Sequence, residues 1–305
     1  MLSKIIAARA YPSNIRGQKQ QPSMGVHPRT QRGVTLIELM VGIAIGLLVV
    51  AVAMGALMVS RGVSGTVSDA SAIQQQAAYA MRVIGQQLRQ AGALRLNLDP
   101  GTTVTDALYM VPVAFEANPP TAVVTDIGGT ASPVTFTVGY SRYTEPVFTS
   151  ASEQAFSRNC LGGPADTSPD TRADSIFSLD TATNTLQCNG NSAGAQPILQ
   201  NVANFQVRYL LQDNTTTPGI PTIKSVDAAA VNADLKNWAR VQGVEVCLVL
   251  YGNEAIDLPT GSNYTDCDGV TKVDMSSLTG TRAKRMHVPF RNVFQLRSQG
   301  LSSVL

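Results

Sequence analysis

Residues 34–59 read VTLIELMVGIAIGLLVVAVAMGALMV, an apolar run with a single charged residue, Glu38. About 20 consecutive apolar residues suffice to cross a bilayer as an α-helix, and a helix satisfies its backbone hydrogen bonds internally. The run is longer than the apolar region of an ordinary signal peptide, and no small-residue cleavage site follows it. It therefore predicts a membrane-spanning helix.

The charges around this run are unevenly distributed. Residues 1–33 hold six basic and no acidic residues, whereas the other 17 Lys and Arg stand against 21 Asp and Glu, a net charge of −4. A basic segment before a membrane helix favours a cytoplasmic amino end. The acidic body argues against a general nucleic-acid binder, whose folded part would be basic. The basic residues of the first segment are Lys4, Arg9, Arg16, Lys19, Arg29 and Arg32.

Glu38 lies near the start of the apolar run. A carboxylate inside the membrane costs roughly 2.5–3.5 kcal/mol, so its presence indicates a functional residue. The plainer interpretation is a carboxylate that reaches the membrane interface. The functional interpretation requires a positive partner in a fixed position, which a new α-amino group at residue 34 would supply.

The residues around Glu38 resemble the cleavage and methylation motif of type IV prepilins. Arg32-Gly33 is followed by Val34-Thr-Leu-Ile-Glu38-Leu-Met-Val41. The resemblance implies cleavage between Gly33 and Val34 by a prepilin peptidase and N-methylation of the new terminus. The family usually has Phe where this chain has Val34, which bears on methylation more than on cleavage.

The resemblance makes residues 1–33 a leader peptide that is removed. Met24 lies ten residues before the expected cut and gives a leader of more usual length, MGVHPRTQRG. Residues 1–23 are therefore expected to be an extension or to lie before the true start.

Helical periodicity continues beyond the apolar run. Apolar residues recur at spacings of three and four, which places them on one helical face. One helix over about residues 34–92 is expected, with a membrane and filament-core half at 34–59 and an amphipathic half at 60–92. Residues 62–68, rich in glycine and β-branched residues, are a candidate hinge. The periodic residues are Ile73, Ala77, Ala80, Met81, Ile84, Leu88 and Ala91, with the glutamines and arginines between them expected on other faces.

Residues 93–305 are expected to form a β-rich periplasmic domain. The stretches with alternating or β-branched apolar residues predict strands, and Pro289 places the last of them at a sheet edge. The loop-like composition of residues 160–196 predicts a loop, and residues 228–238 predict a helix. The whole chain is predicted to be α+β, a long helix followed by an antiparallel sheet, as in the ladle shape of pilins. The predicted strands are Val134–Tyr140, Phe205–Tyr209, Val244–Leu250 and a bent strand over Met286–Leu296.

The four cysteines all lie in the second half of the chain: Cys160, Cys188, Cys247 and Cys267. An even number beyond a membrane signal favours disulfides in an oxidising compartment. Three pairings exist; pairing of neighbours closes loops of roughly 20–30 residues, each worth about 3 kcal/mol. Four free buried thiols are the alternative. No cysteine has a histidine at zinc-ligand spacing.

No motif for catalysis, a metal or a cofactor stands out, so the sequence predicts a protein that is not an enzyme. There is no Gly-x-Ser-x-Gly elbow, and His287 is expected at the surface. Gly128-Gly129 and Gly162-Gly163 are interpreted as turns, because no phosphate-loop lysine follows them. Asp266-Cys-Asp-Gly269 lacks EF-hand spacing, so an Asp-Gly turn is favoured over calcium.

A basic stretch closes the chain. A DNA-binding face is one interpretation, but a solvated or subunit-contacting strand face that balances nearby acidic residues is favoured. The residues are Arg282, Lys284, Arg285, His287, Arg291 and Arg297.

The chain further resembles PilW-type minor pilins in outline, through Leu88–Gly92, Phe205–Tyr209 and Phe290–Arg297. The resemblance implies priming or tip assembly of a type IV pilus. The implied partners are the prepilin peptidase, other minor and major pilins, the inner-membrane assembly platform and membrane lipid. The implied location is the inner membrane with a periplasmic domain, then the pilus. The alternatives are a minor pseudopilin of a type II secretion system and a membrane-anchored periplasmic binding module.

Overall fold

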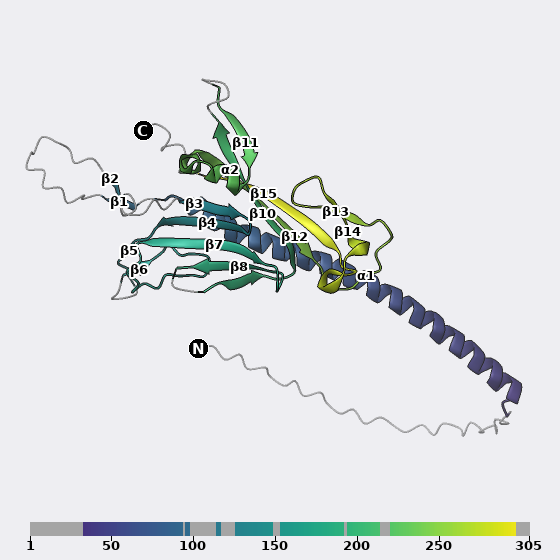
Figure 1. The fold of residues 1–305 in the computed structure, drawn as a ribbon. Helices are drawn as coiled ribbons and strands as arrows, with labels where there is room; N and C mark the ends of the chain where they lie inside the picture. Colours follow the sequence, from purple (N-terminus) through teal and green to yellow (C-terminus); the bar gives the residue numbers. More distant parts are fainter. Residues whose placement is uncertain are drawn as a thin grey trace, which may run out of the picture. The chain divides into compact units, whose positions relative to one another are not determined.

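The computed structural model describes residues 33–93, 95–97, 114–116, 126–148, 153–191, 194–213 and 220–296. The expected leader up to Arg32, the alternative start at Met24 and Arg297 lie outside these residues. The chain divides into two compact units between Ala56 and Leu57. Figure 1 shows a long helix and a set of antiparallel strands, as the α+β prediction required.

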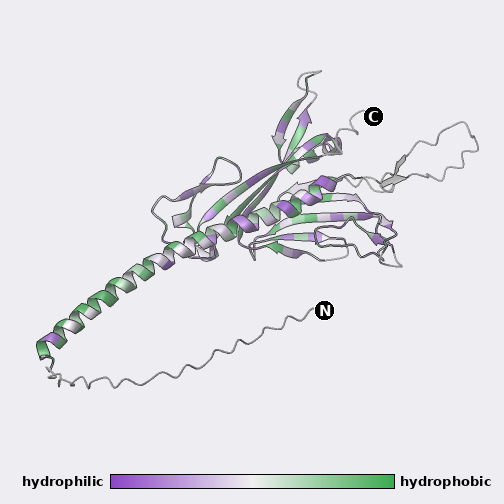
Figure 2. Cartoon of the chain, turned by 180° about the vertical axis from the view of Figure 1, so that it is seen from behind, coloured by the Kyte–Doolittle hydropathy of each residue, from purple (hydrophilic) through white to green (hydrophobic). Residues whose placement is uncertain are grey.

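The first element, α1, runs without a break over Leu36–Gln90 and confirms the single helix predicted at about 34–92. It is long and apolar enough to cross a membrane. Figure 2 colours its amino-terminal part mostly as hydrophobic, whereas polar and apolar residues alternate further along. The candidate hinge at residues 62–68 is regular helix, and the Thr66 hydroxyl donates to the carbonyls of Gly62 and Val63.

A five-stranded antiparallel sheet follows, with strand order β3-β4-β7-β8-β9. The predicted strand at Val134–Tyr140 is confirmed as β4, but the loop predicted over residues 160–196 is wrong because it contains β7 and β8. These strands carry Ala, Ser, Asp, Gln and Asn at many positions, so they lack the apolar alternation that identifies a strand. The strands are β3 (Ile127–Ala131), β4 (Val134–Ser141), β7 (Arg172–Asp180), β8 (Thr185–Gly190) and β9 (Gln196–Leu199).

A second, four-stranded sheet has the order β11-β10-β12-β15, with every pair antiparallel. It confirms the three strands predicted in this part of the chain. The last strand lies at the edge and pairs Pro289 with Val249, which agrees with the position expected from the proline. The strands are β10 (Val202–Asp213), β11 (Thr222–Val226), β12 (Val241–Tyr251) and β15 (His287–Gln295).

The helix predicted over residues 228–238 is two short pieces. The helix α2 (Ala228–Asn232) is capped by the Asp227 side chain, and the 3₁₀ helix η1 (Leu235–Arg240) is capped by Asp234. Asp234 has extended backbone angles, which interrupts the helix.

Three two-stranded pairs and two 3₁₀ turns complete the described elements. They are β1 (Arg95–Asn97) with β2 (Ala114–Glu116), β5 (Thr144–Glu145) with β6 (Gln154–Ala155), β13 (Asn263–Thr265) with β14 (Lys272–Asp274), η2 (Met275–Ser277) and η3 (Gly280–Arg282).

One hydrophobic core joins both sheets to the second half of α1. The predicted helix face is confirmed, because six of its seven apolar residues are buried and Met81 packs at the margin. Gly85 permits the closest approach: a Cβ there would lie 2.6 Å from the Phe294 ring on β15. In the core, Tyr209 packs edge-on against Trp238 with 4.9 Å between ring centroids.

Candidate functional site

The amino end of α1 is closed by reciprocal hydrogen bonds between Thr35 and Glu38. The Thr35 hydroxyl accepts from the Glu38 amide at 3.3 Å. In return, the Glu38 carboxylate accepts from the Thr35 amide and hydroxyl, each at 3.0 Å. This arrangement is a capping box, which provides partners for amides that a helix amino end leaves unpaired. The sequence analysis missed this role, although the Thr-x-x-Glu spacing carries the signal.

Gly33 and Val34, the expected processing site, directly precede this cap. Both residues are exposed and lie outside the helix. An exposed peptide bond before a capped helix is accessible to a peptidase. The geometry therefore suits cleavage at this bond, and the α-amino group that it would create lies four residues before Glu38.

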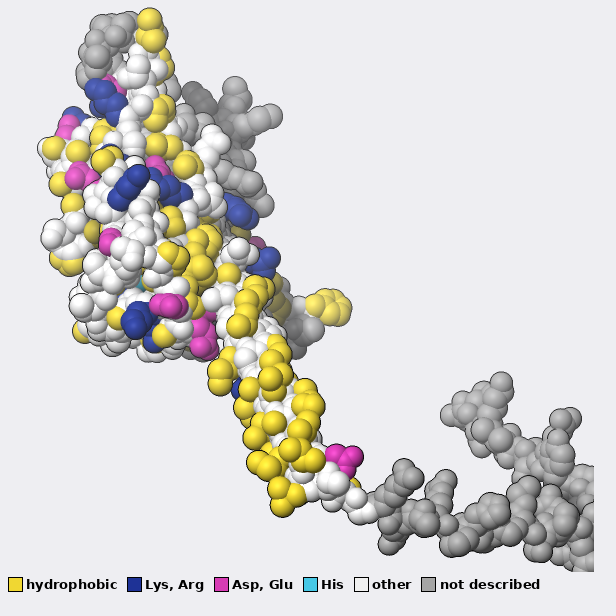
Figure 3. Space-filling model, turned by 90° about the vertical axis from the view of Figure 1, so that its right-hand side faces the viewer, with side chains coloured by type: hydrophobic (Ala, Val, Ile, Leu, Met, Phe, Trp, Pro, Cys, Tyr) yellow, Lys and Arg dark blue, Asp and Glu magenta, His cyan; other side chains and the backbone are white. Residues whose placement is uncertain are grey.

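The apolar side chains that follow have no cover within the described residues. All side chains from Leu36 to Ser64 are exposed, and Leu48, for example, keeps 65% of its surface open. Figure 3 shows hydrophobic side chains gathered on the visible face of this part of the helix. An uncovered helix that is hydrophobic all round requires lipid or other helices around it.

The second half of α1 is fixed to the domain by a buried amide, Gln87. Its Oε1 accepts from the Tyr140 hydroxyl and the Ser175 hydroxyl, both at 3.0 Å, and its Nε2 donates to the Arg158 carbonyl at 3.3 Å. Burial raises the pKa of Tyr140 far above its ordinary value, so the phenol stays neutral and can donate. Gln87 was expected on a different face from the apolar residues, but it is buried beside them, where Tyr140 and Ser175 of the sheet supply its partners.

Both disulfides join neighbours in sequence: Cys160 with Cys188, and Cys247 with Cys267. All four cysteines are paired. The first bridge ties residue 160 to β8, and the second ties the segment after β12 to the sheet face away from the main core, where it forms a small cluster with Val249, Tyr264 and Met275. The bridges therefore attach long connections to the two sheets.

His287 is buried, with 4% of its surface exposed, so the expectation of a surface histidine is wrong. Its ring stacks on Tyr264 at 5.2 Å between centroids, its Nδ1 lies 2.9 Å from the Arg285 carbonyl, and its Nε2 accepts from Arg282 at 3.3 Å. Burial, with a smaller contribution from the nearby Arg282 charge, lowers the pKa of His287 to about 4. The residue was misplaced because the arginines around it suggested an exposed strand.

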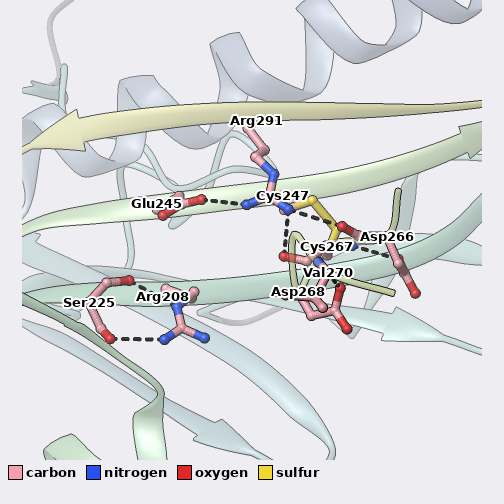
Figure 4. Close-up of polar contacts among 9 residues, drawn as sticks. All are labelled: Arg208, Ser225, Glu245, Cys247, Asp266, Cys267, Asp268, Val270 and Arg291. Carbon is pink, nitrogen blue, oxygen red and sulfur yellow. Dashed lines mark hydrogen bonds and ion pairs between the residues drawn. A yellow bond between two sulfur atoms is a disulfide. The ribbon is translucent and has the colours of Figure 1, made fainter. Parts of the chain in front are cut away.

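The basic stretch makes contacts within the domain. Arg291 forms an ion pair with Glu245 at 3.1 Å and donates to the carbonyls of Asp266 and Cys267, as Figure 4 shows. Arg285 donates to the carbonyls of Gly252 and Asn253. These contacts favour the interpretation of a strand face that balances nearby acceptors.

Asp266 to Gly269 form a turn whose carboxylates already have partners. Asp268 accepts from the Thr271 hydroxyl and from the amides of Val270 and Thr271, and these bonds lower the pKa of its carboxyl. Gly269 has a positive φ of 79°, as a turn requires. Among the described residues, no three His, Cys, Asp or Glu side chains come together as a metal site.

The glycine pairs differ from one another. Gly162 has a positive φ of 78° and lies in a turn, as expected. Gly128 and Gly129 were expected in a turn but lie in β3, where the Tyr209 hydroxyl donates to the Gly128 carbonyl. The Gly128-Gly129 pair therefore makes room for Tyr209 and does not turn the chain.

Two family models match the chain. Residues 28–54 match the prokaryotic N-terminal methylation motif, and residues 170–298 match type IV pilus-assembly protein W. The chain is a type IV pilin-like protein of the PilW type. The second match covers two of the three segments on which the resemblance to PilW rested and begins at residue 170.

Other comparisons add less. No curated protein sequence matches the chain. A solved structure of a type IV-like pilin from Thermus thermophilus is similar with a TM-score of 0.35 and 12% sequence identity, and the match covers 73% of this chain and 95% of that one.

The pilin family indicates the function of several parts of the molecule. The apolar half of α1 anchors the pilin in a membrane and associates it with a pilus. Its partners are other pilins and the assembly machinery, and the family indicates a structural rather than an enzymatic protein.

Proposed function

We propose that this pilin is a minor subunit that takes part in priming or tip assembly of a type IV pilus. The observation that carries the proposal is an exposed apolar helix with one carboxylate at its amino end, joined to a PilW-type domain. In this proposal, residues 1–33 are removed, residues 34–59 form the membrane and filament-core segment, residues 60–92 pack on the domain, and residues 93–305 form the periplasmic domain.

Cleavage after Gly33 would create a positive amine on Val34. Glu38 would then pair with the amine of a neighbouring subunit as helices bundle, because a carboxylate without a positive partner is costly in an apolar bundle. The Thr35 cap supports this role by fixing the carboxylate at the first helical turn. Each new subunit would therefore enter at one axial register.

A minor role is favoured over the major subunit because the domain is large for a simple repeating unit. A minor pseudopilin of a type II secretion system shares the same amino end and is the second candidate. The same physical steps apply to both machines: peptidase cleavage, release from the platform and helix bundling with other subunits.

The first experiment measures the amino-terminal mass of the membrane-extracted protein with and without a prepilin peptidase. Peptidase-dependent production of a terminus at Val34, with or without a methyl group, supports the proposal. An intact leader, or a cut beyond Val59, would overturn it in favour of a membrane-anchored binding module.

A second experiment separates the cap from the register. Glu38→Ala removes both the cap acceptor and the charge, whereas Thr35→Ala removes the cap hydroxyl and keeps the charge. We expect Glu38→Ala to insert in the membrane but fail to enter filaments, and Thr35→Ala to enter them at reduced yield. Normal incorporation of Glu38→Ala would contradict the register role.

A further inference from the structure

A groove of about 450 Å³ lies between α1, just past the apolar run, and the loop that follows β12. A volume of this size is in the range of small-molecule sites. Its lining combines one cation, two carboxylates and apolar side chains. They include Arg61 and Val63 from α1, and Glu254, Ile256, Asp257 and Leu258 from the loop.

The loop wall of the groove is fixed to α1 by a buried carboxylate, Asp69. Its Oδ1 accepts from the Asn253 amide at 2.8 Å and its Oδ2 from the Glu254 amide at 3.4 Å. A Cβ at residue 252 would lie 1.8 Å from the Asp69 carboxylate, so only Gly252 permits this approach. The apolar pattern of the helix gave no sign of this residue, which nonetheless lies on its buried face.

The same loop is held from its other side. Arg285 donates to the carbonyls of Gly252 and Asn253 at 2.8 and 2.7 Å, and the Ile256 amide donates to the Lys284 carbonyl at 2.8 Å. The groove is therefore preorganised, since the backbone of its wall is bound at several points. The side chains of Glu254 and Asp257 stay exposed.

The position of the groove along α1 indicates what it faces. Arg61 comes two residues after Val59, the end of the apolar run. Glu38 and Arg61 are separated by about 35 Å of helix at 1.5 Å per residue, close to the hydrocarbon thickness of about 30 Å. With the apolar run in a bilayer, Arg61 lies among the lipid headgroups on the carboxyl side.

We propose that this groove binds the headgroup of a zwitterionic aminophospholipid. Arg61 would contact the phosphate, and Glu254 and Asp257 would contact the ammonium, while Val63 and Ile256 cover the glycerol end. Two carboxylates disfavour a purely anionic headgroup, because like charges repel. The proposal rests on the membrane anchoring of α1 and not on entry into a filament.

The test reconstitutes the full chain in vesicles of equal parts phosphatidylethanolamine and phosphatidylglycerol. The protein is then extracted, and native mass spectrometry identifies the lipid that stays bound to it. We expect one retained phosphatidylethanolamine in the wild type and about tenfold less in Arg61→Gln, since a charge-assisted contact is lost. A double variant, E254Q and D257N, is expected to retain both lipids alike.

The matched control is Arg82→Gln, which removes the same charge from an exposed position further along α1. It is expected to retain lipid as the wild type does. Equal retention by R61Q and R82Q, or a second copy of the chain in place of the lipid, would overturn the proposal. Filament entry is scored separately, so loss of lipid with normal filaments leaves the assembly function intact.

Discussion

The two halves of α1 share one secondary structure and have opposite surroundings. Leu48 in the first half keeps 65% of its surface exposed, whereas Ile84 in the second half is completely buried. In the second half, apolar residues recur on one face and the chain's own sheets cover them. The first half is apolar all round, so only lipid or other helices can cover it. Both halves are therefore helical, but different partners cover their apolar side chains.

The polar residues of the two halves differ in the same way. Glu38 bonds to Thr35, three residues away. Gln87 and Asp69 bond to residues 53 to 185 positions away in the sequence. The polar side chain of the first half thus has a local hydrogen-bond partner, whereas those of the second half have distant ones.

The largest expected effect tests this difference with matched core and exposed substitutions. Ile84→Ala should lower the free energy of unfolding of the domain by about 2–5 kcal/mol, because it leaves a cavity. Leu48→Ala should change it by less than about 0.5 kcal/mol. Urea unfolding of the full chain in detergent, followed by fluorescence of the buried Trp238, measures both. A large loss in Leu48→Ala would show that the first half also packs on the domain.

Much of the fold could be predicted because its signals are local. The apolar run and the three- and four-residue period predicted α1, and the Val- and Phe-rich stretches predicted β4, β10, β12 and β15. The strands β7 and β8 could not be found in this way, because small and polar residues occupy many of their positions. Phe177, for example, is buried between Ile176 and Ser178 in a run with no regular alternation.

The candidate site was predicted less completely. The motif around Glu38 is contiguous in sequence, so the processing site could be proposed from it. Asp69, Gln87 and His287 are polar residues that are buried because distant segments supply their partners. Pairings over such sequence distances leave no periodic signal, and polarity alone indicates exposure.

The second prediction concerns the disulfides, which act on the domain alone. The double variant C247A and C267A removes a bridge between residues 20 apart. Loss of a loop of that size should lower the unfolding free energy by about 3 kcal/mol, because the unfolded chain gains entropy. The urea midpoint measures the loss, and cleavage after Gly33 should stay unchanged. An unchanged midpoint would contradict the prediction.

The third prediction is a pH dependence confined to the domain. Burial lowers the pKa of His287 to about 4 from 6.5, so the folded state binds the proton less well than the unfolded state. Stability should be constant above about pH 6.5 and fall by about 1–3 kcal/mol as the pH drops to 4. Urea midpoints across this range measure the loss.

His287→Gln is the control for this pH dependence, because it removes the titration and should flatten the profile between pH 6.5 and 4. The carboxyls of Asp166 and Asp268 have lowered pKa values, so they affect stability mainly below their ordinary pKa of 3.8. They therefore contribute little to the change in stability between pH 6.5 and 4. The same slope in His287→Gln would assign the effect to another group.

The smallest expected effect distinguishes two adjacent glutamines. Gln87→Leu leaves the Tyr140 hydroxyl only the Arg158 carbonyl and removes an acceptor from Ser175. Such a loss should lower the unfolding free energy by about 1–2 kcal/mol. Gln86→Leu makes the same change on the exposed face and should be nearly neutral. If the two variants unfold alike, the buried amide adds nothing to the attachment of α1, and apolar packing alone distinguishes the two halves of the helix.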